Sequence, residues 1–400
     1  NKNMSDNRNI IYHFRVRGTG AERVHIAGIA NGFRSLGHKV TMVSPVDTDF
    51  SAQDQPHRRS FFSGALAFLA DHAPQILFEI MEIAYNISGV KKLKRKVRNN
   101  NIDFIYERHA FYNLVGTIIS KKFNIPLIVE VNELSGFERV RGQVLVKLAH
   151  KFDERIFKQA TLIVVVSNLL KEKIADMLGS DEKIIVVPNG VSKSWINSTF
   201  SNEELNYLAK QLDIINNKVI GFVGGLSHWH NFDFMIDVIS DLLNIYPDLI
   251  LLIVGDGQLK DYIISLAQKR GIQNSVKTTG KIPHREIQKY IQLFDIALIP
   301  HSNQFRSPIK LFEYMGTGKA VVAPSTDPIR SVISNGIDGL LFESKNKKDI
   351  IKKLTLLLSD ASLRRKFGKQ AQICITEKYL WEIHATQILK KFDELNLNQE

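Results

Sequence analysis

Short apolar runs alternate with longer segments whose apolar residues recur every three or four positions, and the alternation occurs twice along the chain. Short apolar runs are typical of strands buried on both faces, and the amphipathic segments between them predict helices. The pattern therefore predicts an α/β protein with two parallel, doubly wound sheets. In the first half we expect a helix over 20–36 and strands at 10–14, 40–43, 104–106, 127–130, 162–166 and 184–187. In the second half we expect strands at 218–223, 250–254, 296–299 and 320–323.

The two halves are joined by a polar stretch. Pro188–Val191 stops the first set of strands, and residues 192–217 are rich in Asn and Ser, with a helix expected at 202–212. We therefore predict one α/β domain over 1–195 and a second over 196–380. The last segment, 381–400, is expected to hold a terminal helix from about Trp381 to Leu395.

Composition narrows the class of protein. The chain has 400 residues, 44% of them hydrophobic, and one cysteine, Cys374, which excludes an internal disulfide and a thiolate metal cluster. No apolar run approaches the roughly 18–20 residues of a membrane span, and residues 1–8 lack the apolar core of a signal peptide. We expect a cytoplasmic protein.

The formal net charge of +12 is concentrated in the first half, where 28 Lys and Arg face 19 Asp and Glu. The densest part is 91–98. Upstream of it, Pro74 can open a helix whose apolar residues between Ile76 and Ile87 share one face. Such a segment could rest on an anionic bilayer surface, at the inner face of the cytoplasmic membrane. The equal alternative is a core helix followed by a solvated basic helix. A nucleic-acid partner is not expected, because no recognised module or interleaved aromatics accompany the charge.

The most informative stretch of the sequence is 307–323. A Ser-Pro turn opens a short helix there, Glu313 lies one turn inside it, and the apolar strand 320–323 follows. A helix N-terminus attracts an anion such as a diphosphate, and a carboxylate one turn deeper accepts hydrogen bonds from a vicinal diol. A phosphate site beside a diol site indicates a nucleotide.

This segment resembles the donor-binding segment of the retaining family 4 glycosyltransferases, which have the GT-B fold of two facing Rossmann-like domains. The resemblance implies that Glu313 holds the ribose of a nucleotide-sugar. It also implies that the preceding residues hold its phosphates; these are Ser307, Pro308, Ile309 and Lys310. In that fold the first domain binds the acceptor, the second binds the donor, and the terminal helix crosses back to the first domain.

Several glycine-containing turns extend the resemblance. Gly20 and Ala21, after the first strand, match the family's Gly-Gly beside the donor phosphates. In the second half, the matching positions are the Gly224–Gly225 turn, Gly255, and a loop around Ile282 that is expected to contact the base.

The sequence departs from the family at three places. Gly225 and His230 stand where the family has a phosphate-binding Arg and Lys, so we expect His230, protonated or as a neutral donor, and Lys310 to supply phosphate contacts. Phe305 replaces a frequent second Glu, which leaves the identity of the sugar open. Asn132 stands where relatives carry a His near the reacting centre.

Acceptor residues are less evident. Glu107, His109 and Glu133 follow strands and are candidates for orienting an acceptor hydroxyl, or are polar strand ends without a catalytic role. As catalytic residues we name Glu313, Lys310, His230, Asn132, Glu133 and His109.

The resemblance implies a retaining, metal-independent transferase without a resident cofactor, the nucleotide-sugar being a co-substrate. We expect the nucleotide of the donor to be UDP, with GDP as the second choice. We expect the acceptor to be a lipid-linked or glycan molecule of cell-surface polysaccharide synthesis. The alternatives are a soluble small-molecule acceptor, a nucleotide-sugar 2-epimerase of the same fold, and a non-catalytic protein that binds sugar nucleotides or polyanions.

Overall fold

The computed structural model describes residues 7–16, 20–45, 74–137 and 142–397. The chain divides into two compact units, the first made of residues 1–188 and 381–400 and the second of residues 189–380. The expected turn residues 17–19 lie outside the described part.

The first unit is built on a six-stranded parallel sheet with the strand order β2-β1-β3-β4-β5-β6. Its strands are β1 (Asn9–His13), β2 (Lys39–Val43), β3 (Phe104–Arg108), β4 (Leu127–Val131), β5 (Leu162–Val165) and β6 (Ile184–Val186). Its helices are α1 (Ala21–Ser35), α3 (Gln75–Arg98), α4 (Val115–Phe123), α5 (Val146–Gln159), α6 (Asn168–Leu178) and α16 (Trp381–Leu397). All six strands match apolar runs of the sequence. The inner strands β3, β4 and β5 are almost wholly buried, whereas the edge strands β2 and β6 are only partly buried.

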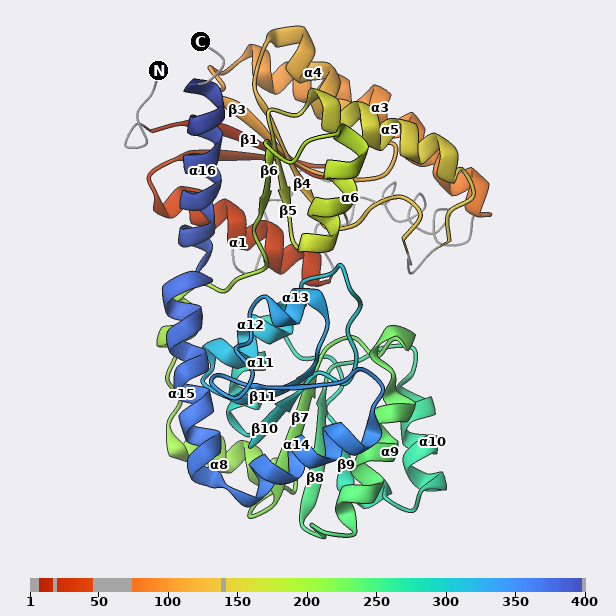
Figure 1. The fold of residues 1–400 in the computed structure, drawn as a ribbon, viewed down its shortest axis with the longest axis vertical. Helices are drawn as coiled ribbons and strands as arrows, with labels where there is room; N and C mark the ends of the chain where they lie inside the picture. Colours follow the sequence, from red (N-terminus) through yellow and green to blue (C-terminus); the bar gives the residue numbers. More distant parts are fainter. Residues whose placement is uncertain (1–6, 17–19, 46–73, 138–141, 398–400) are drawn as a thin grey trace. The chain divides into compact units, whose positions relative to one another are not determined.

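Helices cover both faces of this sheet (Figure 1). The helices α1 and α16 pack over one face and bury a core that includes Phe33, Tyr106 and Trp381. Their close approach depends on Gly28 and Gly32 of α1, since a Cβ on Gly28 would lie 2.2 Å from the Trp381 ring. The helices α3, α4 and α5 lie side by side on the other side.

The second unit has a six-stranded parallel sheet with the order β12-β11-β10-β7-β8-β9. Its strands are β7 (Lys218–Val223), β8 (Leu249–Val254), β9 (Val276–Thr278), β10 (Ile296–Leu298), β11 (Ala320–Pro324) and β12 (Leu340–Phe342). Its longer helices are α8 (Asn202–Gln211), α9 (Phe232–Leu243), α10 (Lys260–Lys269), α11 (His284–Gln292), α12 (Ile309–Gly316), α14 (Lys347–Ser359) and α15 (Ala361–Lys378). Two short ones are α7 (Lys193–Asn197) and α13 (Asp327–Arg330).

The structure differs from the sequence-based expectation at three points. The strands β9 and β12 were not expected, because each has three residues and stands at an edge of its sheet, too short for a periodic signal. The first unit ends at Pro188 and not at residue 195, since Trp195 packs with α12 in the second unit.

The third difference concerns α3. It is one continuous helix, and Ile76, Leu77, Ile80 and Ile87 on it are 49%, 48%, 51% and 80% exposed. The interpretation of 76–87 as a core helix is therefore wrong.

Candidate functional site

The helix α12 carries the main predicted site residues, and its first turn is fixed by Asn189. The backbone N–H of Asn189 donates to Ser307 Oγ (3.0 Å), and its Nδ2 donates to the Ser307 carbonyl (2.5 Å). Pro308 then caps the helix in an extended conformation, which suits a proline just before a first turn. Ser307, Pro308 and Ile309 thus form a fixed helix start, as the resemblance implies.

Glu313 lies on α12 with its side chain 6% exposed, and its Oε1 is 2.6 Å from Nε2 of His284. The ring of Trp195 lies 5.4 Å from the His284 ring. The same Trp195 donates from Nε1 to the Glu313 carbonyl (3.1 Å) and to Thr317 Oγ1 (3.0 Å). His284 therefore fixes the carboxylate of Glu313, and Trp195 fixes the backbone of the same residue.

Lys310 points its ammonium group into a buried position. Its Nζ is buried, has no hydrogen-bond partner among the described residues, and lies 4.0 Å from the centre of the Phe222 ring. Burial lowers the pKa of Lys310 to about 7, although the charge of Glu313 acts in the opposite direction. A buried amine that lacks a partner indicates a position for an anion.

His230 lies beside the same Phe222 ring, 5.0 Å between ring centres. Its Nδ1 is buried and also has no partner among the described residues. Burial, aided by the positive charge of Lys310, lowers the pKa of His230 to about 2. Of the two states expected from the sequence, the neutral donor is therefore the one that the unliganded structure favours.

The glycine turns meet at this place. Gly224 has φ +152°, and a Cβ on it would lie 2.7 Å from Lys310 Nζ, so the turn after β7 and the α12 lysine adjoin. Gly225 follows and is exposed. Gly255, with φ +146°, packs against the Gly224 carbonyl and pairs with Gly280 of the loop that carries Ile282. The second unit thus brings together the segments that the sequence singled out in it.

One predicted residue of the first unit, Asn132, contacts a buried carboxylate, Glu130. Its oxygens contact His25 Nε2 (2.8 Å), Arg108 Nη1 (2.5 Å) and the Tyr106 hydroxyl (2.9 Å). Asn132 also donates to Glu130 from Nδ2, at 2.8 Å. Burial alone would raise the pKa of Glu130, but the charges of His25 and Arg108 hold it below its ordinary value. Asn132 is therefore positioned by a charged cluster at the end of β4.

His109 and Glu107 lie inside the first unit. The His109 side chain is 1% exposed, and its Nε2 is 2.9 Å from Asp153 Oδ1. Glu107 is equally buried, 2.5 Å from His13 Nδ1, and accepts the backbone N–H of Gly116 at 2.8 Å. Because an acceptor cannot reach such groups, the structure argues against the predicted contact of His109 with an acceptor hydroxyl. Glu133 is half-buried at the end of β4.

Gly20 caps the start of α1, as expected for a turn beside a helix N-terminus. Its backbone N–H donates to Glu22 Oε1 at 3.2 Å, and Ala21 is the first residue of the helix. Among the described residues, no group of three or more His, Cys, Asp and Glu side chains is placed to hold a metal ion.

Comparison with known families decides the identity. Residues 19–195 match the model described as Glycosyltransferase Family 4, and residues 207–373 match the one described as Glycosyl transferases group 1. The chain belongs to the family 4 glycosyltransferases. The resemblance expected from the sequence is thereby confirmed, as is the GT-B fold.

Two relatives are similar to this chain over most of their length, and a solved structure has the same fold. An uncharacterised glycosyltransferase of Methanocaldococcus jannaschii is 25% identical over 323 residues, 78% of this chain and 80% of that protein. The alpha-monoglucosyldiacylglycerol synthase of Acholeplasma laidlawii is 19% identical over 372 residues, 90% of each chain. The crystal structure of Anabaena HepE in complex with UDP has a TM-score of 0.72 at 18% identity, covering 96% of this chain and all of that one.

Sequence reasoning about this glycosyltransferase missed two site residues, His284 and Trp195. His284 directly follows the 280–283 loop that the resemblance had placed near the base, so its position in the sequence was a usable signal. Trp195 gave no signal, because only the fold brings it to α12, more than a hundred residues later in the chain.

Proposed function

We propose that this glycosyltransferase transfers a sugar from a UDP-sugar to a hydroxyl group of a lipid-linked or glycan acceptor, with retention of configuration and without a divalent metal. The observation that carries the proposal is the arrangement of Lys310, His230 and Glu313 around the start of α12. Two buried nitrogens there have no hydrogen-bond partner in the described part of the chain, and one buried carboxylate lies a turn away.

Each group suits one part of a nucleoside diphosphate. Lys310 and His230 are placed to bind phosphate oxygens beside the Gly224–Gly225 turn, whose exposed backbone permits close approach. Glu313 accepts hydrogen bonds from the ribose hydroxyls, with His284 holding its second oxygen. The 280–283 loop adjoins Gly255 and contacts the base.

The same residues explain how transfer is assisted. As the glycosidic bond breaks, negative charge grows on the leaving diphosphate, and a fixed cation and a fixed N–H donor stabilise it without reorganising. Binding the anion in turn favours the charged form of Lys310, because an opposite charge within about 4–6 Å raises the pKa of an amine. In the proposed retaining reaction, the donor's own phosphate oxygen takes the acceptor proton on the face where the new bond forms.

Two relatives support the choice of substrates. Structures of the Anabaena protein HepE hold UDP and UDP-glucose, which favours UDP over GDP. The Acholeplasma relative is a synthase of a glucosylated diacylglycerol, which favours an acceptor with a lipid part. We place the enzyme in cell-surface glycan synthesis on the cytoplasmic side of the membrane.

Glu313→Gln tests the proposal. We expect it to weaken UDP binding in calorimetry by roughly 10–100-fold, since charge-assisted hydrogen bonds contribute about 1.5–3 kcal/mol each. Sugar transfer from the UDP-sugar to a lipid extract should fall by at least as much. The matched control is Glu286→Gln, which removes an exposed carboxylate of α11 and should change neither quantity.

Comparison of UDP with GDP, ADP and dTDP in the same calorimeter tests the base. Stronger binding of GDP than UDP would overturn the choice of donor. Unchanged UDP affinity in Glu313→Gln would overturn the assignment of the site.

A further inference from the structure

The helix α3 presents one solvent-facing stripe with two chemical halves. Residues at helical spacing along it are exposed, first apolar ones (Leu77, Ile80, Ile87) and then basic ones (Lys91, Arg95). Isolated exposed apolar residues are ordinary, but four large aliphatic residues within twelve positions of one helix form a patch.

The neighbouring helix α5 repeats this order in the same direction. Val144 and Leu148, at its start, are 57% and 36% exposed, and Lys151, Arg155 and Lys158 follow on the same side. The two apolar ends lie together, because Glu79 of α3 accepts the backbone N–H groups of Val144 (2.7 Å) and Leu145 (2.8 Å). One surface therefore carries an aliphatic patch and a basic patch side by side.

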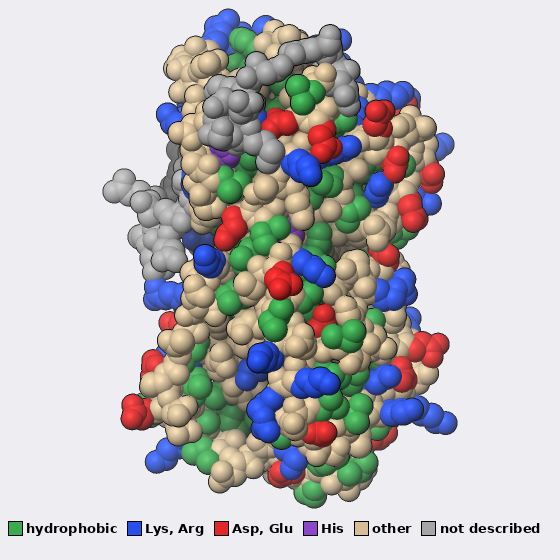
Figure 2. All heavy atoms as spheres, turned by 60° about the vertical axis from the view of Figure 1, so that its left-hand side comes forward, with side chains coloured by type: hydrophobic (Ala, Val, Ile, Leu, Met, Phe, Trp, Pro, Cys, Tyr) green, Lys and Arg blue, Asp and Glu red, His purple; other side chains and the backbone are tan. Residues whose placement is uncertain are grey.

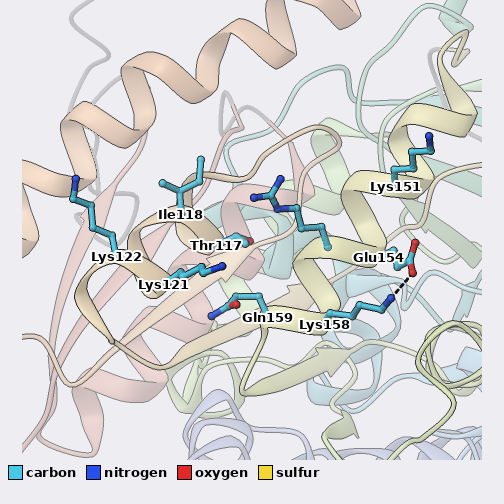
Figure 3. A pocket seen from close by; sticks show the side chains of 9 residues that line it. Thr117, Ile118, Lys121, Lys122, Lys151, Glu154, Lys158 and Gln159 are labelled. Atoms are coloured by element: carbon cyan, nitrogen blue, oxygen red, sulfur yellow. Dashed lines mark hydrogen bonds and ion pairs between the residues drawn. The ribbon is translucent and has the colours of Figure 1, made fainter.

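An open hollow of about 620 Å³ lies between α4 and α5 in the basic part (Figure 3). Its lining combines Thr117, Ile118 and Gln159 with five cations and one carboxylate, namely Lys121, Lys122, Lys151, Arg155, Lys158 and Glu154. Among the described residues, an ion pair offsets one of these cations, Lys158, which lies 2.5 Å from Glu154. In Figure 3, Lys121 points toward the α5 side of the hollow, whereas Lys122 extends away from it, toward α3.

The cations of α3 and α4 are close enough to influence one another. The positive charges of Arg98 and Lys122 lower the pKa of Lys94 on α3. By contrast, the faces of the two units that are turned forward in Figure 2 each show basic and acidic side chains interspersed. An excess of one sign that its own surroundings do not neutralise favours an anionic partner.

We propose that the α3–α4–α5 surface of the first unit docks on an anionic phospholipid bilayer, with the aliphatic patch entering the headgroup region and the α4–α5 hollow receiving lipid phosphates. Aliphatic side chains beside a Lys-rich face are typical of helices that lie on a membrane. Protein interfaces, in contrast, are enriched in aromatic residues and depleted in Lys. The exposed cations of this surface are six Lys and three Arg, namely Lys91, Arg95, Arg98, Lys121, Lys122, Lys147, Lys151, Arg155 and Lys158, and Lys94 beside them is half-buried.

Co-sedimentation of the full chain with vesicles tests the proposal. Two kinds of vesicle are compared at physiological salt: pure phosphatidylcholine, and phosphatidylcholine with about 30% phosphatidylglycerol. The anionic lipid gives the second kind a negative surface potential. We expect the protein to sediment with the anionic vesicles and to stay in solution with the neutral ones.

Two double variants separate the patches. Lys151→Glu/Arg155→Glu changes the hollow, and Ile80→Gln/Ile87→Gln changes the aliphatic patch with residues that keep the helix. Each should lower the apparent partition constant roughly tenfold or more. All four positions are exposed, so thermal unfolding and UDP binding, which belongs to the second unit, should stay as in the unchanged protein.

The controls make the same chemical changes in the second unit. Lys366→Glu/Lys369→Glu alters the net charge equally, and Ile245→Gln/Ile337→Gln removes two equally exposed isoleucines. Neither should change the partition.

Three results would overturn the proposal: no sedimentation with anionic vesicles, an equal loss in the second-unit charge control, or full binding by Ile80→Gln/Ile87→Gln. The last would show that the vesicle is bound through charge alone and that the aliphatic patch does not enter the headgroup region. The vesicle experiment does not depend on the donor site. If the protein does not bind vesicles, the proposed UDP site is unaffected, and if UDP binding fails, the vesicle result still holds.

Discussion

Burying an amine without a partner is costly, and this protein does so at Lys310. The Phe222 ring offsets part of the cost through a cation–π contact, and a pKa of about 7 shows that the remainder makes the neutral form readily accessible. Lys319 is a useful contrast, since its pKa is also lowered, to about 8, but its Nζ donates to the Gln292 carbonyl at 2.8 Å. The first lysine awaits a ligand, whereas the second has a partner within the fold.

Lys310→Met should therefore weaken UDP binding by about 10–100-fold, because the variant loses a charged contact of about 1.5–3 kcal/mol to phosphate. It should not destabilise the unliganded protein, since an apolar side chain replaces a buried amine that has no hydrogen bond to lose. Calorimetry and chemical unfolding measure the two effects. Lys319→Met should do the reverse, lowering the unfolding free energy and keeping UDP affinity, and an equal loss of affinity in both variants would contradict the assignment.

UDP affinity should also fall as pH rises above about 7. The pKa of Lys310 in the free protein is lowered to about 7, so above that pH the amine is mostly neutral and must take up a proton when UDP binds. His230 does not compete in this range, because its pKa is lowered to about 2. Calorimetry between pH 6.5 and about 9 measures the fall in UDP affinity. Repeating it in buffers of different ionisation enthalpy measures the proton uptake. The fall should persist in Lys319→Met and vanish in Lys310→Met.

At the level of elements, the site depends on how α12 is held at both ends. Asn189 fixes its first turn and Trp195 its last, and both precede the first strand of their unit. The sequence predicted α12 and Glu313 from local signals: a Ser-Pro start, glycines at the end and a following apolar strand. The resemblance to the family added Lys310. The sequence did not reveal Trp195 or His284 as partners of Glu313, because contacts between distant segments have no periodic signature.

The contact between α1 and α16 is the second element-level feature. Trp381 is 4% exposed and lies against Gly28 and the His25 ring. We expect Trp381→Ala to lower the unfolding free energy by about 3–5 kcal/mol, through lost burial and a residual cavity. Denaturant unfolding measures this. Leu397→Ala, at the 63% exposed end of the same helix, should change it by less than about 0.5 kcal/mol.

At the scale of the whole molecule, the two units carry different chemistry. The first has the basic and aliphatic surface and the buried Glu130 cluster, and the second has the Lys310, His230 and Glu313 arrangement. Within the described residues, no helix is both long and apolar enough to cross a bilayer.

Hydrogen exchange should locate the nucleotide in the second unit. We expect UDP to slow exchange in segments 224–231, 280–284 and 309–313, because bound phosphate and base order the turns that contact them. The α3–α5 amides should not change. Mass spectrometry of peptic fragments measures this, and protection centred on the first unit would refute the placement of the donor.

The sequence by itself determined the fold class, because buried strands, helix starts and glycine turns are encoded by neighbouring residues. Its motifs also determined the family and named the candidate donor-site residues. It could not decide whether the apolar face of α3 is buried, because burial depends on what packs against a helix and not on its own periodicity. The tertiary structure alone placed His109 inside the first unit, His284 on Glu313, and the cations of α3, α4 and α5 on one surface. These arrangements join residues far apart in the chain, and only the packing of the helices on their sheets brings them together.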